Sequence, residues 1–317
     1  APLTPMPPAR SRAATIEPLM KILLLGKNGQ VGWELQRSLA PLGELIALDR
    51  HSTVHCGDLS RPEALAQTVR DVRPDVIVNA AAHTAVDKAE SEPDVARTLN
   101  ATAPAALAQA AAEVGGWLVH YSTDYVFNGE GQTPWQEGDA TGPLGVYGQT
   151  KLEGEQHIAA SGCKHLIFRT SWVYAARGGN FARTMLRLAQ ERERLTVIDD
   201  QRGAPTGADL IADVSAHAIR QALGTQDTAL SGIYHLVAAG ETSWHGYASH
   251  AIERARQIQP DAPWKVTEIA PVPTSAFPTP ARRPLNSRLN TQRLQTRFGL
   301  TLPAWQQGVD RLLAEIL

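Results

Sequence analysis

Between residues 20 and 170, short apolar segments alternate with longer segments whose apolar residues recur at helical spacing. Strand patterns occur at 21–25, 44–49, 75–79, 117–122 and 165–170, and helical patterns at 30–39, 62–72, 95–114 and 148–160. Strands separated by helices of this length form right-handed βαβ units and a parallel sheet. The alternation predicts an α/β protein with a doubly wound parallel sheet, and Pro104 is expected to kink or break the helix at 95–114.

After residue 170 the periodic pattern becomes weaker. It indicates helices at 180–190, 208–223 and 303–317 and strands at 195–198 and 232–237. The stretch 262–290 contains six prolines and cannot be mostly helical. We therefore interpret 20–170 as a nucleotide-binding domain and 171–317 as returning sheet elements combined with a smaller C-terminal substrate-binding lobe.

Residues 1–19 differ in composition from the rest of the chain. They include five prolines and no apolar run of about 7–15 residues, so they do not resemble a secretory signal. We expect a disordered extension, or an upstream start of translation with Met20 as the functional beginning. A short ordered arm is the alternative.

Charge and cysteine content exclude several classes of protein. The chain has 30 Lys and Arg against 32 Asp and Glu, which argues against a nucleic-acid partner held by bulk positive charge. Its two cysteines, Cys56 and Cys163, exclude a disulfide framework and favour the reducing cytoplasm. No apolar run approaches the roughly 18 residues of a membrane span, so no membrane partner is expected.

A glycine-rich loop connects the first predicted strand to the first predicted helix. Gly26, Gly29 and Gly32 have the spacing G-x-x-G-x-x-G, with Gln30 and Val31 between the last two. Glycines allow the backbone to approach a pyrophosphate closely, and the helix N-terminus offers free N–H groups and a positive dipole end. We predict a dinucleotide site here, although a plain turn has a similar composition.

The second predicted strand ends in Asp49, which Arg50 follows. An acid about 20 residues past such a loop accepts from an adenosine ribose hydroxyl and favours NAD. Arg50 suits a 2′-phosphate instead, so the choice between NADH and NADPH stays open. Asp58 and Leu59 lie where such folds place adenine contacts, and a cap of the following turn is the alternative for Asp58.

Small residues follow the third predicted strand. Ala82, His83 and Thr84 leave room for a ligand, which in open α/β sheets lies beyond the carboxyl ends of the strands. We expect the cofactor to pass here. Core packing of the alanine and a solvated loop position for His83 are the alternatives.

Three polar residues together suit proton transfer to a carbonyl oxygen. Thr123 follows the fourth predicted strand, and Tyr147 and Lys151 form a Y-x-x-x-K pair on one helical face. A nearby ammonium lowers the pKa of a phenol, which then exchanges a proton with a carbonyl oxygen or an alcohol. Thr123 donates a second hydrogen bond to that oxygen, and a nicotinamide supplies the hydride. The combination predicts an oxidoreductase; a helical surface pair is the alternative.

Asn100 is a polar residue within the alanine-rich helical pattern at 95–114. We expect it to hold a helix kink and a water that relays protons to Lys151. An exposed helical position is the alternative.

Seven sequence blocks together resemble the dTDP-4-dehydrorhamnose reductases, a branch of the extended short-chain dehydrogenase/reductase family. The blocks are GKNGQVGWELQ, NAAAHTAVDKAE, HYSTDYVF, VYGQTK, FRTSWVY, GAPTG and TPARRPLNS. The resemblance implies a Rossmann-type fold and reduction of the C4 ketone of dTDP-4-dehydro-β-L-rhamnose to dTDP-L-rhamnose by NADPH or NADH. In the family this is the last step of the synthesis of that sugar nucleotide, which feeds cell-surface polysaccharides such as the O-antigen of lipopolysaccharide.

The resemblance also assigns roles to single residues. Tyr147 is the proton donor, Lys151 its partner and Thr123 the group that polarises the carbonyl. Besides the loop glycines and the Tyr147–Lys151 pair, the cofactor is expected on Gln30, Val31, Asp49, Arg50, Asp58, Leu59, Ala82, His83, Thr84 and Tyr121. The sugar nucleotide is expected on Thr123, Asp124, Tyr125 and Trp172, with Arg282 and Arg283 near the diphosphate.

Trp172 suits this role because aromatic faces pack against the apolar faces of sugars. The alternatives are a core aromatic for Trp172 and a surface basic pair for the two arginines.

Some members of the family hold Mg²⁺ at a homodimer contact. The matching carboxylates are Glu34, Asp209 and Glu315, with Asp209 one methylene shorter than the familiar glutamate. Mg²⁺ demands tight octahedral oxygen geometry. Solvated carboxylates are the alternative.

Two other functions share much of this pattern. A sugar-nucleotide dehydratase carries Asp-Glu after the threonine, whereas Asp124 is followed by Tyr125; an epimerase keeps its NAD bound. A regulatory subunit of reductase-like fold needs no catalysis, so the fold alone does not prove activity. The presence of Thr123, Tyr147 and Lys151 favours an enzyme.

Overall fold

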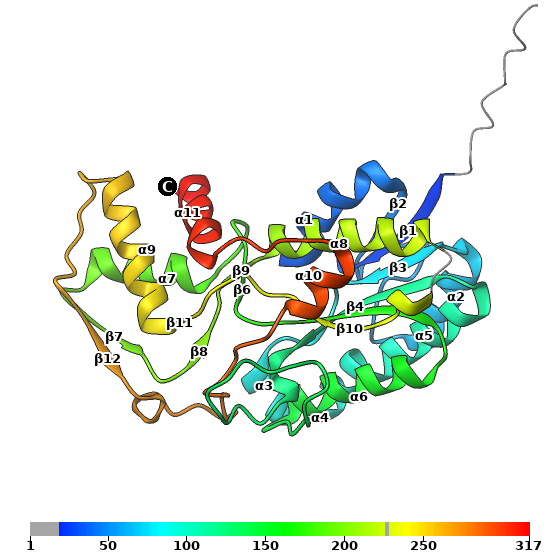
Figure 1. Cartoon of the computed structure of the whole chain (residues 1–317), viewed down its shortest axis with the longest axis horizontal. Helices are drawn as coiled ribbons and strands as arrows, with labels where there is room; N and C mark the ends of the chain where they lie inside the picture. Colours follow the sequence, from blue (N-terminus) through cyan, green and yellow to red (C-terminus); the bar gives the residue numbers. More distant parts are fainter. Residues whose placement is uncertain (1–18, 226–227) are drawn as a thin grey trace, which may run out of the picture.

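The computed structural model of the chain describes residues 19–225 and 228–317 (Figure 1). The expectation for residues 1–19 therefore lies outside the described residues, apart from Leu19.

A parallel sheet forms the larger half of the molecule. Its strands are β1 (Met20–Leu25), β2 (Gly43–Leu48), β3 (Val76–Asn79), β4 (Trp117–Thr123), β5 (Lys164–Thr170) and β10 (Gly232–His235). Within the described residues these six strands lie in the order β10-β5-β4-β3-β1-β2, with every neighbouring pair parallel. The predicted doubly wound sheet is confirmed. The direction of strand addition reverses between β1 and β3, which opens a crevice at their carboxyl ends.

Helices cover both faces of this sheet (Figure 1). One layer consists of α1 (Gln30–Leu39) and α8 (Ala208–Gly224), and the other contains α2 (Pro62–Val72), α5 (Ala103–Val114) and α6 (Val146–Ala160). Successive strand residues point to opposite faces. Ile22 accordingly packs with Leu35 of α1, and Leu23 with Leu65 of α2, in two separate buried clusters.

The helical pattern at 95–114 is interrupted, but before Pro104. The chain forms α3 (Val86–Ser91), α4 (Pro93–Arg97) and a π-turn over Thr98–Thr102 that leads into α5. Pro104 follows the π-turn within the same helical run and cannot donate to the carbonyl of Asn100 four residues earlier, because it has no N–H. The irregularity expected around Pro104 is therefore the π-turn directly before it, which contains Asn100.

The smaller half is built from elements after residue 170. Its strands are β6 (Val173–Tyr174), β7 (Arg194–Ile198), β8 (Arg202–Gly203), β9 (Thr206–Gly207), β11 (Thr242–Ser243) and β12 (Glu268–Val272). Its helices are α7 (Phe181–Glu191), α9 (Trp244–Ile258) and α11 (Trp305–Ile316), while α10 (Gln292–Phe298) lies against β10. Strand β12, inside the proline-rich stretch, pairs in parallel with β7 and was not predicted.

This half has its own core, in which Tyr247 of α9 and Trp305 of α11 are almost fully buried. However, α8 and β10 also come from beyond residue 170 and complete the large sheet. The division of the chain at residue 170 into two domains stays a prediction.

Candidate active site

The glycine loop lies between β1 and α1, at the crevice beside β3. Gly26 has a φ of +85°, and a Cβ there would lie 2.8 Å from the backbone nitrogen of Ala81. A Cβ on Gly32 would overlap the carbonyl oxygen of Gly26. Gly29 is the N-cap of α1 and provides no side-chain cap. The first N–H groups of α1 are thus offered to a ligand, as a pyrophosphate site requires.

Asp49 lies just beyond β2, and its carboxylate faces this loop. It accepts hydrogen bonds from Asn28 Nδ2 at 2.6 Å and from the backbone N–H of His51 at 2.8 Å. These contacts, with the backbone bond from His51 the largest cause, lower the pKa of Asp49. Arg50 is exposed, with its Nε 3.0 Å from His51 Nε2. Asp49 and Arg50 both lie where the adenosine ribose is expected, so the choice between NADH and NADPH stays open.

Asp58 caps the turn that follows it. Its Oδ1 accepts from the backbone N–H of Ser60 at 2.9 Å and from Ser60 Oγ at 2.8 Å. Leu59 is buried in the core beneath α2. The side chain of Asp58 therefore has the capping contacts of the alternative interpretation, and an adenine contact at these two positions stays a prediction.

Asn100 connects the loop after β3 to α6. It is fully buried; its Oδ1 accepts from the backbone N–H of His83 at 2.9 Å, and its Nδ2 donates to the His83 carbonyl at 3.1 Å. Nδ2 also lies 3.2 Å from Thr150 Oγ1 on α6. The exposed alternative for Asn100 is thus wrong, as is the solvated alternative for His83, which is 9% exposed. The water relay to Lys151 stays a prediction.

Thr123 and Tyr147 meet at the carboxyl end of β4. The side chain of Thr123 partly offsets the raised pKa of the Tyr147 hydroxyl, and its Oγ1 donates to Asp124 Oδ1 at 3.1 Å. The ring of Tyr125 packs edge-to-face against that of Tyr147, with centroids 5.4 Å apart. The first turn of α6 thus brings the phenol of Tyr147 next to the alcohol of Thr123 on β4. Both groups are able to face a single carbonyl oxygen.

Lys151 lies one turn further along α6 and is 2% exposed. Its Nζ donates to the backbone carbonyl of Tyr121 at 2.6 Å and lies 3.4 Å from His120 Nε2. The hydroxyl of Tyr121 itself points to the other side of the sheet, 2.7 Å from Ser215 Oγ on α8. The backbone of Tyr121, rather than its side chain, therefore faces the lysine.

Burial dominates the electrostatics of this group. It raises the pKa of Tyr147 to about 12 and that of Asp124 to about 7. It lowers the pKa of Lys151 to about 8, which the negative charge of Glu155 partly opposes. The expectation that lysine lowers the pKa of the tyrosine is not met in this arrangement. Tyr147 is instead protonated at neutral pH, the state that a proton donor to a ketone needs.

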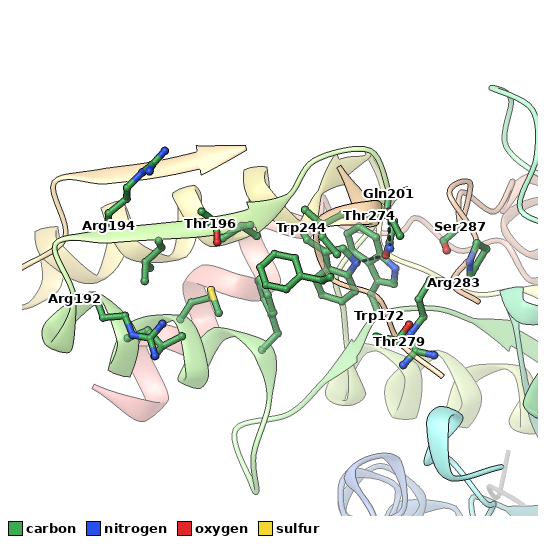
Figure 2. Close-up of a pocket in the computed structure, with 18 of the residues that line it drawn as sticks. Trp172, Arg192, Arg194, Thr196, Gln201, Trp244, Thr274, Thr279, Arg283 and Ser287 are labelled. Atoms are coloured by element: carbon green, nitrogen blue, oxygen red, sulfur yellow. Dashed lines mark hydrogen bonds between the residues drawn. The ribbon is translucent and has the colours of Figure 1, made fainter. Parts of the chain in front are cut away.

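A cavity of about 530 Å³ lies between the two halves (Figure 2). Tyr125, Trp172 and Arg283 line it, as expected from the sequence, whereas Arg282 is exposed and outside it. Arg283 Nη2 is 2.8 Å from Asp87 Oδ2. Trp172 is only half-buried and faces the cavity, so the core alternative is not supported.

Several lining residues were not predicted. They are Arg192, Arg194, Gln201, Trp244, Thr274 and Ser287. They come from five separate segments without a shared motif, so no local spacing identifies them. Ser287 is the exception, because it ends the block TPARRPLNS.

The three candidate metal ligands line one small cavity, but together with Arg311. Arg311 Nε lies 3.5 Å from Asp209 Oδ2 and 3.3 Å from Glu315 Oε1, and Glu34 pairs with Arg37 at 3.5 Å. Throughout 19–225 and 228–317, no three acidic, histidine or cysteine side chains are placed to hold a metal ion. In this arrangement the carboxylates are neutralised by arginines and do not fit Mg²⁺.

In the part of the chain that the structure describes, no helix is long and apolar enough to cross a membrane.

The fold and the site together define a class of protein. A parallel sheet with a glycine loop at its reversal point and a Thr–Tyr–Lys group at the end of β4 is the arrangement of the extended short-chain dehydrogenases/reductases.

Comparisons with known proteins narrow this class. A family model described as "RmlD substrate binding domain" matches residues 20–317. A dTDP-4-dehydrorhamnose reductase of Escherichia coli (strain K12) is 63% identical over 297 residues, which cover 94% of this chain and 98% of the relative. The chain therefore belongs to the RmlD substrate binding domain family, as the sequence blocks indicated.

Solved structures agree with this membership. The crystal structure of a dTDP-4-dehydrorhamnose reductase from Clostridium acetobutylicum has a TM-score of 0.84 at 35% identity, with 93% of this chain and 99% of that chain covered. A second reductase of that name, from Bacillus anthracis in complex with NADP, has a TM-score of 0.82 at 33% identity, with the same coverage. The Rossmann-type fold expected from the sequence is thus confirmed.

Proposed function

We propose that this chain reduces the C4 ketone of dTDP-4-dehydro-β-L-rhamnose to dTDP-L-rhamnose, with NADPH or NADH as the hydride donor. The identity of 63% over 94% of the chain to a reductase of that name is the observation that carries the proposal. The placing of buried Thr123 and Lys151 and of partly buried Tyr147 around the end of β4 supports it.

The residues present fit a dinucleotide cofactor, which supplies a hydride when bound. The free N–H groups at the start of α1 would hold its pyrophosphate, and Ala82 to Thr84 follow β3, the strand next to β1. Tyr147, kept protonated at neutral pH by burial, would donate its proton to the ketone oxygen. Thr123, whose hydroxyl donates to Asp124 in the structure, would turn this proton to the same oxygen when the substrate is bound.

The cavity accommodates the sugar nucleotide. Tyr125 and Trp172 line it where the sugar would bind, and Arg283, which pairs with Asp87, offers a guanidinium that matches the oxygens of the diphosphate. The unpredicted arginines Arg192 and Arg194 line the same cavity and add positive charge for an anionic ligand.

Tyr125 also separates this proposal from dehydration. It stands directly after Asp124, where a dehydratase carries its glutamate, and its ring packs on Tyr147. A regulatory subunit has no need of a buried lysine beside a tyrosine and a threonine at the end of β4. The homodimer, the cytoplasmic location and the O-antigen as destination stay predictions.

The test is NADPH and NADH consumption with dTDP-4-dehydrorhamnose generated in situ, run with EDTA and with added Mg²⁺. We expect consumption of cofactor with dTDP-L-rhamnose as the product. Folded protein that binds cofactor but consumes none with this substrate would contradict the proposal and point to another sugar nucleotide or to a regulatory role. A loss of turnover in EDTA that Mg²⁺ restores would show that the carboxylates near Arg311 hold a metal after all.

A further inference from the structure

Trp172 adopts a backbone conformation that is unusual for a large residue. Its φ is +49°, in the left-handed region that disfavours side chains with a Cβ. Residues held in such conformations concentrate at ligand sites, where the surrounding structure imposes them. The contacts of the Trp172 indole show which neighbours hold the residue in this backbone conformation.

One face of the Trp172 indole is covered by Gly203 of β8. A Cβ built on Gly203 would lie 2.8, 3.1 and 3.2 Å from three bonded ring atoms of Trp172, Cε2, Cζ2 and Cδ2. Nearly equal distances to an atom and two of its bonded neighbours place that position directly above the ring rather than at its edge. The backbone of Gly203 is thus in contact with the ring face, and no larger residue fits there without moving the indole.

The other face is covered by Trp244. The two indoles are stacked, with centroids 3.9 Å apart and planes 20° from parallel. Trp244 cannot lie on the same side as Gly203, because its ring would then be among the nearest neighbours of the Gly203 Cβ position. Both segments are held together by pairing, since Gly203 of β8 is opposite Thr242 of β11, two residues before Trp244.

Trp244 is itself fixed by hydrogen bonds. Its Nε1 donates to Gln201 Oε1 at 2.9 Å, and Gln201 Nε2 donates to Thr274 Oγ1 at 3.1 Å. Figure 2 shows these residues in the middle of the cavity, between Arg192 and Arg194 at one end and Arg283 at the other. In contrast, no described residue accepts a hydrogen bond from the indole N–H of Trp172.

We propose that Trp172 contacts the substrate through its edge and its unpaired indole N–H, not through its face, and that Gly203, Trp244 and Gln201 are positioning residues that fix this orientation. The proposal rests on the proposed function for the identity of the substrate. It replaces the expectation that a sugar stacks on the Trp172 ring, because both ring faces are already covered.

The first test changes the surface under the indole. Gly203→Ala is expected to raise the KM for dTDP-4-dehydrorhamnose about 10-fold or more, with kcat and the Kd of NADPH little changed. Stacked indoles couple in the far-ultraviolet circular dichroism spectrum, and this signal should change in the same variant. Gly138→Ala is the matched control, since a Cβ there meets nothing within 4 Å.

Three further variants keep the proposal testable if Gly203→Ala does not fold. Trp244→Phe keeps a flat ring against Trp172 but loses the N–H that bonds to Gln201, so it should raise KM less than Trp244→Leu, which should raise it as Gly203→Ala does. Trp172→Phe keeps the ring but lacks the N–H and should weaken binding of dTDP-L-rhamnose about 5- to 10-fold in calorimetry.

Two results would overturn the proposal. The first is a folded Gly203→Ala protein with an altered dichroism signal and an unchanged KM, because the orientation of Trp172 would then be irrelevant. The second is a Trp172→Phe protein with unchanged affinity. Absence of turnover in the wild type would instead refute the proposed function, while the dichroism of Gly203→Ala would still report on the stacked pair.

Discussion

The Nζ atom of Lys151 lies 2.6 Å from the carbonyl oxygen of Tyr121, so the lysine of the Y-x-x-x-K pair is anchored to strand β4. Its partner Tyr147 contacts Thr123 at the end of the same strand. Helix α6 therefore presents both residues to β4, and the strand sets the distance between the proton donor and the ammonium.

Replacement of Lys151 by methionine tests this buried position. Burial lowers the pKa of Lys151 from its ordinary value near 10.5 to about 8, so the folded state binds its proton less tightly than the unfolded chain does. Stability from this group is present above pH 10.5 and is lost as pH falls through 8. The free energy of unfolding, measured in urea, should rise between pH 7 and pH 10 by about 2–3 kcal/mol more in the wild type than in Lys151→Met. A constant difference across this range would contradict the burial effect.

Removal of the Tyr147 hydroxyl tests the proton donor. Tyr147→Phe should keep cofactor binding and lower kcat by about 10²- to 10⁴-fold, because only the transferred proton is removed. NADPH oxidation gives kcat, and quenching of protein fluorescence by NADPH gives the control. A phenylalanine variant with near-normal kcat would remove Tyr147 from its proposed role.

The buried carboxyl of Asp124 should change stability with pH in the direction opposite to the buried amine of Lys151. Burial raises its pKa to about 7, so its contribution to stability is complete below about pH 4 and is lost as pH rises through 7. The melting temperature of Asp124→Asn should therefore rise relative to the wild type between pH 5 and pH 8. Asp94→Asn, at a fully exposed position on α4, should show no such trend.

Two glycines of the first loop separate folding from binding. A Cβ on Gly29 has only the Gly26 carbonyl nearby, at 3.4 Å, so Gly29→Ala should keep the fold but weaken NADPH binding about 10-fold by crowding the pyrophosphate. Gly32→Ala places a Cβ against the Gly26 backbone and should cost more than about 2 kcal/mol of stability. Melting curves with and without NADPH distinguish the two effects; normal affinity in Gly29→Ala would show that the pyrophosphate lies elsewhere.

Periodicity predicted the large sheet well because each of its elements carries its own local signal. The helix at 62–72 has the predicted bounds, since Pro62 marks its first turn and Leu65, Val69 and Val72 repeat on one face. The helix at 95–114 shows the limit of the method. Asn100 bonds to the loop after β3, and a contact 17 residues away cannot be recognised from helical spacing.

The cavity was predicted only where a motif marked it. Trp172 and Arg283 belong to recognisable blocks, whereas Gln201, Trp244 and Thr274 have no pattern of their own. Their positions depend on the pairing of β8 with β11 and on one hydrogen bond that spans 73 residues. Such relationships arise only when distant segments meet in the folded chain.

The return of the chain to the large sheet has a consequence for engineering this enzyme. Helix α8 covers one face of the sheet and β10 extends its edge. In the sequence, both lie between two groups of cavity residues, one that ends at Gln201 and one that begins at Trp244. A cut at residue 170 would leave that face bare, so the two halves are interleaved rather than joined end to end. Replacing residues 171–317 as one block would also remove α8 and β10 from the large sheet. A new substrate specificity therefore has to be introduced by single substitutions in the cavity.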